Sequence, residues 1–81
     1  MPLKAYVLIN TQIGKTSEVA ETLRNMPEIK HLDIIMGPYD IIAEVETKDH
    51  DELSEMVLKK LQTIEYIQHT MTCPVLKVEG D

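Results

Sequence analysis

The sequence predicts a small α+β protein in which strands and helices follow the order β-α-β-β-α-β. Three features support this order. Apolar residues alternate as in strands over residues 4–10 and 39–47, and recur at helical spacing over residues 16–26 and 49–64. A Gly-Pro pair at 37–38 marks a turn. Two right-handed crossovers in this order are typical of a ferredoxin-like sandwich, in which two helices cover one face of an antiparallel sheet. A length of 81 residues leaves room for a single domain, residues 1–81.

The first strand and the first helix are expected near the start of the chain. Residues 4–10 (KAYVLIN) carry apolar side chains on both faces of a strand, which is typical of a central strand covered on both sides. Thr16 or Ser17 is the expected N-cap of the helix, and Pro27 is its stop signal. Between these signals, apolar residues recur at helical spacing: Val19, Ala20, Leu23 and Met26.

A β-hairpin is expected in the middle of the chain. Its strands are residues 28–36 and 39–47, which alternate apolar and polar side chains. The Gly-Pro pair at 37–38 is compatible with a two-residue turn of type II′ between them. The third strand then begins with a tyrosine followed by an acid, Asp40.

The second helix and the last strand complete the predicted fold. Asp49, followed three residues later by Glu52, resembles a capping box at the start of a helix over residues 49–64. Residues 65–79 are expected to contain the last strand. Pro74 lies inside it and cannot donate a ladder hydrogen bond, which predicts an edge strand or a bulge.

Two short helices leave one face of the predicted sheet without cover. Leu8, Ile34 and Val75 would not all fit beneath those helices. An apolar sheet face without cover implies a partner, and the simplest partner is a second copy of the chain.

The composition argues against several other partners. The formal net charge is −6, whereas direct binding to nucleic acid or to an anionic membrane requires clustered Lys and Arg. The longest apolar runs are too short to cross a bilayer, and the first residues (MPLK) lack the apolar core of a signal peptide. A single cysteine suits a reducing compartment, so the expected location is the cytoplasm.

Three features that could carry chemistry have simpler interpretations. IGKT, residues 13–16, lies where a phosphate-binding loop would lie, but that motif needs a glycine where Ile9 stands. The three histidines have no metal-ligand spacing with one another or with Cys73, so neither a metal nor another cofactor is expected. Cys73 has no base placed beside it and is expected to be a buried, inert thiol.

Asp40 and two threonines of the last strand each have two interpretations. Asp40 can accept hydrogen bonds from N–H groups of the turn, or it can hold the ammonium group of a small ligand. Thr70 and Thr72 lie on the same side of a strand, where two hydroxyls can bind a polar ligand. Threonine also favours strands by propensity alone.

The hairpin segment MGPYDIIAEVE, residues 36–46, resembles the Gly-x-Tyr-Asp hairpin of the RAM domain. That domain is the C-terminal effector module of the Lrp/AsnC, or feast/famine, transcription regulators. The resemblance covers essentially the whole chain, including the Gly14 loop before a helix that ends MPEI, and the Thr-x-Thr of Thr70 and Thr72. Full-length regulators carry an N-terminal helix-turn-helix, whereas this chain begins at the first strand. It therefore resembles a stand-alone RAM domain that does not bind DNA itself.

The resemblance implies an assembly and a ligand site. Two sheets would face one another in a dimeric α/β barrel, and such dimers would associate into an octamer or a decamer, with full-length Lrp/AsnC regulators as further possible partners. An amino-acid effector would lie between dimers. The residues implied to bind it are Gly37, Tyr39 and Asp40 of the hairpin, Thr70 and Thr72 of the last strand, and His50 and Ile34 at neighbouring positions.

Three functions follow from these observations. The predicted one is a non-enzymatic module that binds an amino acid and modulates transcription regulation, with no catalytic residues. The second is a small dimeric α/β-barrel enzyme of the monooxygenase or isomerase type, which would need a His or Tyr aimed into a pocket and an acid/base pair, and no such pair is evident. The third is an interaction domain without a ligand.

Overall fold

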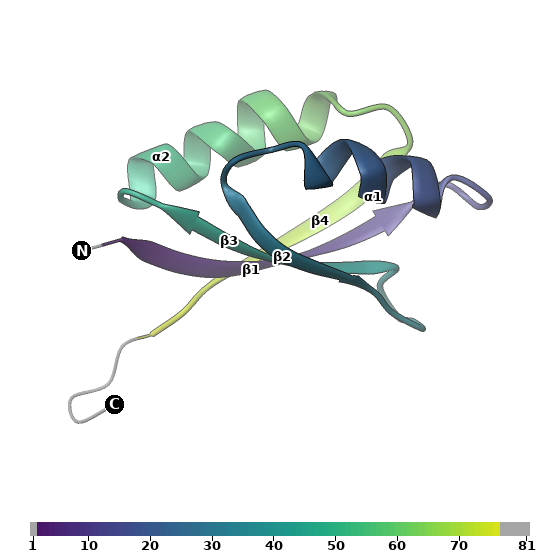
Figure 1. Cartoon of the computed structure of the whole chain (residues 1–81), viewed down its shortest axis with the longest axis horizontal. Coiled ribbons are helices and arrows are strands. Elements are labelled where there is room, and N and C mark those ends of the chain that lie inside the picture. Colours follow the sequence, from purple (N-terminus) through teal and green to yellow (C-terminus); the bar gives the residue numbers. More distant parts are fainter. Residues whose placement is uncertain (1, 77–81) are drawn as a thin grey trace.

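The computed structural model describes residues 2–76 of the chain. One four-stranded sheet carries all helices on one of its faces (Figure 1). In chain order the elements are β1 (Leu3–Thr11), α1 (Thr16–Arg24), β2 (Ile29–Ile34), β3 (Ile41–Thr47), α2 (His50–Glu55), its continuations η1 (Met56–Lys60) and η2 (Leu61–Thr63), and β4 (Ile67–Pro74). This order confirms the predicted α+β, ferredoxin-like fold. Positions 77–79 of the predicted last strand lie outside the described residues.

The strands lie in the order β2-β3-β1-β4, and each neighbouring pair is antiparallel. The strand β1 is therefore central, as its apolar residues on both faces predicted. The strand β4 pairs only with β1, which confirms the edge position that Pro74 indicated. Val7 of β1 lies opposite Ala43 and Thr72, and because Val7 and Ala43 are fully buried, Thr72 also lies on the helix side of the sheet.

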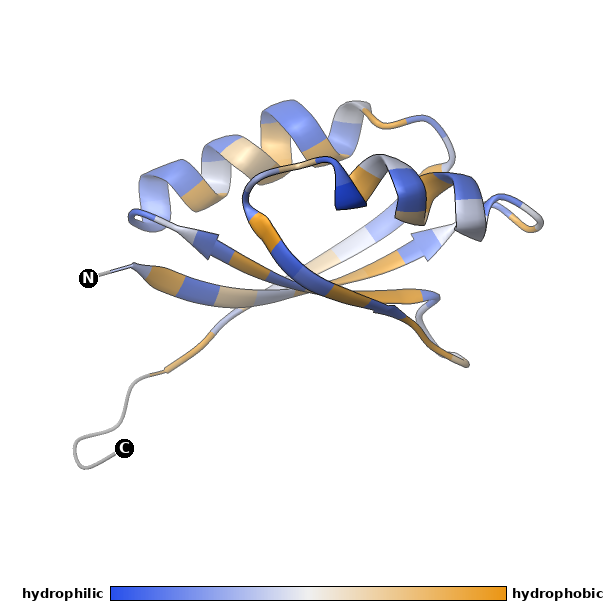
Figure 2. Cartoon of the chain, in the orientation of Figure 1, coloured by the Kyte–Doolittle hydropathy of each residue, from blue (hydrophilic) through white to orange (hydrophobic). Residues whose placement is uncertain are grey.

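The core lies between the helices and the sheet and is aliphatic. Hydrophobic and hydrophilic residues alternate along the strands and around the helices (Figure 2), so each element has one apolar side. The buried apolar residues are Ala5, Val7, Ile9, Val19, Ala20, Leu23, Ile41, Ala43, Val45, Leu53, Met56 and Leu61.

The two helices begin differently. Asp49 caps α2 as predicted, because its Oδ1 accepts the backbone N–H of Glu52 at 2.9 Å. The predicted cap of α1 is wrong, since Lys15 occupies the N-cap position and no side chain caps the helix there. The hydroxyl of Thr16 lies instead 2.7 Å from that of Thr11, so it is committed to the end of β1.

The hairpin between β2 and β3 is longer than predicted. The N–H of Ile35 donates to the carbonyl of Asp40 at 2.8 Å, which leaves residues 36–39 as a four-residue loop. Gly37 has φ +29°, and the Gly37-Pro38 peptide bond is cis. The two-residue type II′ turn is therefore wrong, and β3 begins at Ile41 rather than at Tyr39.

The second face of the sheet carries no helix (Figure 1). Its centre is apolar, because Leu8 lies opposite Ile42 on one side and Met71 on the other, while Tyr6 lies opposite Cys73. Cys73 is exposed in the single chain, so the expectation of a buried thiol is wrong there. We call this surface the open face and define it by Tyr6, Leu8, Ile42, Met71 and Cys73.

Ile34 does not contribute to the open face. It lies opposite buried Ile41 and therefore on the helix side. Because β2 is an edge strand, 51% of Ile34 remains exposed. None of the helices in residues 2–76 is long and apolar enough to span a membrane.

Candidate functional site

The carboxylate of Asp40 is fixed at one end of the sheet. The N–H of Asp40 donates to the carbonyl of Ile9 at 2.9 Å, which continues the β1–β3 ladder by one residue. Its Oδ2 accepts the backbone N–H of Thr11 at 2.8 Å and lies 3.4 Å from the Thr11 hydroxyl. Within residues 2–76, the Asp40 carboxylate accepts hydrogen bonds only through Oδ2, and Oδ1 has no hydrogen-bond partner there. The one N–H donor belongs to Thr11 of the neighbouring strand β1 and not to the turn, where one interpretation of the sequence placed it.

The remaining hairpin residues fold over the end of β1. The side-chain amide of Asn10 donates to the carbonyl of Pro38 at 3.0 Å. The hydroxyl of Tyr39 lies 3.9 Å from Sδ of Met71, which places the Tyr39 ring on the side of the open face. Gly37 is exposed, and a Cβ placed on it would meet nothing within 4 Å. The Gly37 backbone is therefore open to close approach from outside.

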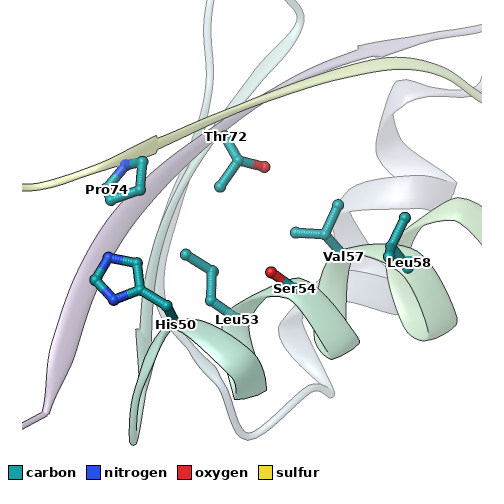
Figure 3. A pocket seen from close by; sticks show the side chains of 7 residues that line it. All are labelled: His50, Leu53, Ser54, Val57, Leu58, Thr72 and Pro74. Atoms are coloured by element: carbon teal, nitrogen blue, oxygen red, sulfur yellow. The ribbon is translucent and has the colours of Figure 1, made fainter.

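A groove lies between β4 and the second helix. Figure 3 shows Thr72 and Pro74 on the strand facing His50, Leu53, Ser54 and Val57 on the helix. With Leu58, these residues enclose a volume of about 370 Å³. Only an imidazole and two hydroxyls contribute polar side-chain atoms, so the groove is mostly apolar. We call it the β4–α2 groove.

Thr70 lies on the same side of β4 as Thr72, as predicted. It pairs with buried Ile9, two residues along β1 from Val7, the partner of Thr72. Thr70 does not line the β4–α2 groove. Its side of the strand continues from the groove toward the end of the sheet that carries Asp40.

The seven predicted site residues fall into two groups within one chain. Asp40 lies beside Ile9, whereas His50 follows Thr47, which pairs with Leu3 at the other end of β1. Leu3 and Ile9 are six positions apart on an extended strand, so His50 and Asp40 are separated by about 20 Å along β1, whereas Thr72 lies opposite Val7, only two positions from Ile9. The hairpin group is Ile34, Gly37, Tyr39 and Asp40, and the groove group is His50 and Thr72. Thr70, opposite Ile9, lies on β4 at the same end of β1 as Asp40.

One residue that contacts Asp40, Thr11, was not predicted from the sequence. Thr11 is only 6% exposed, and its hydroxyl lies between Asp40 and Thr16. Thr11 and Asp40 are 29 residues apart, so no local pattern could have paired them. The only signal that the sequence offered for this contact was a threonine at the end of an apolar strand.

A cation lies on the neighbouring loop at the same end of the sheet. The ammonium of Lys15 lies 4.8 Å from the centre of the Tyr66 ring and 3.3 Å from the Glu18 carboxylate. The hydrogen bond to Glu18, with the negative charge of that residue, raises the pKa of Lys15 above its ordinary value. Lys15 therefore stays charged and carries a local counter-ion of its own.

Metal and phosphate sites find no support in the described part of the chain. No group of three or more His, Cys, Asp or Glu residues is placed to hold a metal ion in residues 2–76. Gly14 has φ +83° in a turn closed by the N–H of Lys15 on the carbonyl of Gln12 at 3.0 Å. This is the ordinary loop glycine that the missing second glycine of the phosphate motif predicted.

Comparison with known proteins gives a consistent family. The model of the Lrp/AsnC ligand binding domain matches residues 4–79. The HTH-type transcriptional regulator FL11 of Pyrococcus furiosus is 39% identical over 77 residues, which cover 95% of this chain and 50% of that protein. The chain thus spans about half the length of the regulators it matches.

Solved structures share the fold. The crystal structure of FFRP-DM1 is 35% identical, with a TM-score of 0.88, and the match covers 91% of this chain and 99% of that one. The transcriptional regulator NMB0573 of Neisseria meningitidis, solved as a complex with L-Met, has a TM-score of 0.84 at 23% identity. That match covers 93% of this chain and 50% of the regulator, and at this identity it shows the fold alone.

Proposed function

Because the chain belongs to the Lrp/AsnC ligand binding domain family, we propose that it is a non-enzymatic effector module that binds an amino acid and modulates amino-acid-responsive transcription. Its relatives include a named transcriptional regulator. The observation that carries the proposal is the Asp40 carboxylate, which is held through one oxygen at an exposed hairpin and offers the other to a ligand.

The chemistry of the two residue groups suits the parts of an amino acid. Oδ1 of Asp40 accepts the α-ammonium group in a charge-assisted hydrogen bond. The exposed backbone around Gly37 is open to the α-carboxylate. The β4–α2 groove takes the ligand side chain between Leu53, Val57 and Pro74, with the Thr72 hydroxyl at its wall. An apolar amino acid is therefore the proposed ligand class.

A complete site requires two copies of the chain. Asp40 and His50 lie at opposite ends of β1, about 20 Å apart along the strand, so within a single chain one amino acid does not reach from Asp40 to the His50 end of the groove. We therefore assign the hairpin of one copy and the groove of a second copy to one ligand. Binding then favours the assembled state, because the ligand contacts both copies only there.

The open face supports a dimer through sheet-to-sheet packing. Its apolar centre, with Leu8 between Ile42 and Met71, would be buried by the same face of a second copy. Such packing gives a dimeric α/β barrel, and association of dimers through hairpin and groove gives a ring, an octamer or a decamer. Burial in the dimer would also cover the Cys73 thiol.

Regulation without catalysis fits the composition of the β4–α2 groove. The β4–α2 groove contains His50, and its other polar side chains are Ser54 and Thr72, so an acid/base pair is missing from its lining. A formal charge of −6 argues against direct DNA contact by this domain. We propose that it acts on transcription by assembling with full-length Lrp/AsnC regulators.

A screen of the twenty amino acids by thermal shift tests this function, followed by multi-angle light scattering with each ligand that stabilises the protein. We expect stabilisation by one or a few apolar amino acids and a mass well above that of a dimer. A stable protein that none of the twenty stabilises would contradict the effector function. A monomer at micromolar concentration, with or without ligand, would contradict the site between copies.

A further inference from the structure

Thr11 connects three elements at the end of the sheet that carries Asp40. It is the last residue of β1, its N–H donates to Oδ2 of Asp40 at 2.8 Å, and its hydroxyl lies 2.7 Å from that of Thr16 in the first turn of α1. The same hydroxyl lies 3.4 Å from Oδ2 of Asp40. With 6% exposure, Thr11 is one of two buried polar residues in the described part of the chain.

The direction of these hydrogen bonds follows from their chemistry. An ionised carboxylate only accepts, so a bond between Thr11 and Asp40 must take its proton from the Thr11 hydroxyl. That hydroxyl then has no proton left for Thr16, and the Thr16 hydroxyl is the donor of the shorter bond. The chain of donors therefore runs from Thr16 to Thr11 to Asp40.

We infer that Thr11, supported by Thr16, is a positioning residue that turns the Asp40 carboxylate so that Oδ1 faces the ligand ammonium. Two donors from one buried residue converge on Oδ2 and fix the carboxylate plane relative to β1 and α1. Without the hydroxyl, one backbone N–H remains and the carboxylate rotates more freely. Positioning of this kind raises affinity because less rotational freedom is lost when the ligand binds. This inference rests on the proposed role of Asp40 in holding the ammonium group.

The test variant is Thr11→Val, which keeps the backbone N–H and the branched shape but removes the hydroxyl. Thr47→Val is its matched control, since Thr47 is also a buried threonine, 3% exposed, and lies at the other end of the sheet with its hydroxyl on the carbonyl of Asp49. Calorimetric titration with L-methionine and with each amino acid that stabilises the protein gives the affinities. Thr11→Val should weaken amino-acid binding about five-fold relative to the wild type. Thr11→Ser, which keeps the hydroxyl, and Thr47→Val should both bind with wild-type affinity.

A double-mutant cycle with Asp40→Asn separates positioning from general destabilisation. If Thr11 acts through Asp40, Thr11→Val has no further effect on affinity in the Asp40→Asn protein. Equal losses in both backgrounds would overturn the inference, as would wild-type affinity in Thr11→Val. Thr16→Ala provides a milder second variant should Thr11→Val fail to fold, and unchanged affinity there would also overturn it. If the wild-type protein binds none of the twenty amino acids, both the proposed function and this inference fail. If only the double-mutant cycle fails, the inference is wrong and the proposed function stands.

Discussion

The phenolic oxygen of Tyr39 lies 3.9 Å from Sδ of Met71, on the face of the sheet that no helix covers. This contact joins the hairpin to the edge strand β4 across β1, because Met71 lies opposite Leu8. The next residue, Asp40, turns back to the backbone of Thr11. Two adjacent residues therefore reach two different surfaces, and under the proposed function Tyr39 borders the sheet-to-sheet interface while Asp40 meets the ligand. The hairpin links the two kinds of contact between copies.

Leu8→Glu should dissociate the sheet-to-sheet dimer. Leu8 is half-buried at the centre of the open face, between Ile42 and Met71. A second sheet would bury the new carboxylate without a partner charge, which destabilises an interface strongly. Multi-angle light scattering should show a lower mass for Leu8→Glu. The control is Ile13→Glu in the loop after β1, where Ile13 is 97% exposed and the added charge stays in water. Unchanged mass for Leu8→Glu would place the interface elsewhere.

Asp40→Asn and Asp40→Ala should differ in stability but not in binding. The amide oxygen of asparagine still accepts the N–H of Thr11, so Asp40→Asn should keep most of the free energy of unfolding. Asp40→Ala leaves that N–H without a side-chain acceptor and should lower the free energy of unfolding by about 1–2 kcal/mol. Both variants lose the charge that holds the ammonium group and should weaken amino-acid binding at least about ten-fold. Urea unfolding and calorimetry measure the two effects, and unchanged affinity in Asp40→Asn would remove Asp40 from the ligand site.

The sequence predicted the elements better than the connections between them. Apolar spacing located β1, α1 and β3, Pro74 identified the edge strand, and Asp49 marked the start of α2, because each signal acts within a few residues. The turn at Gly37 was misjudged, because the closing pair lies one residue outside the position that a type II′ turn requires.

The candidate site was less predictable than the fold, for a physical reason. The partner of Asp40 is Thr11, on a strand that is separated from β3 in the chain by a helix and another strand. Side chains that meet through tertiary structure leave no periodic pattern in the sequence. The distance between the hairpin and the groove was equally hidden, because it depends on register and strand order, and the assembly of the two groups depends on further copies of the chain.

Lys60→Met should destabilise the fold in a pH-dependent way. The hydrogen bond from the Lys60 ammonium lowers the pKa of the Glu28 carboxyl, and the other Glu28 oxygen is buried without a partner among the described residues. A lowered folded-state pKa means that the pair stabilises the fold above the ordinary glutamate pKa, and that this stabilisation disappears as the pH falls through the lowered value. The free energy of unfolding should therefore fall by about 1 kcal/mol at neutral pH, with a smaller loss in acid.

Urea unfolding of wild type and Lys60→Met at neutral and acidic pH measures this difference. Lys59→Met is the control, because Lys59 lies on the same η1 turn and forms no salt bridge within residues 2–76. It should unfold like the wild type at both pH values. An equal loss of stability in Lys60→Met at neutral and acidic pH would assign the effect to packing of the lysine stem rather than to charge.

Mixing two variants that each bind weakly should restore high-affinity binding, because the site is proposed to take Asp40 from one copy and Thr72 from another. Thr72→Val removes the hydroxyl from the wall of the β4–α2 groove and keeps a branched side chain of the same shape, so it should weaken binding without loss of fold. In assemblies refolded from equal amounts of Asp40→Asn and Thr72→Val chains, random placement leaves about a quarter of the sites with both native residues. Calorimetry should then detect that fraction of high-affinity sites.

A mixture of Asp40→Asn with the double variant Asp40→Asn/Thr72→Val is the control, since no combination of those chains contains a native Asp40. Absence of high-affinity sites in the first mixture would confine the ligand to a single chain, in which β1 lies between Asp40 and Thr72.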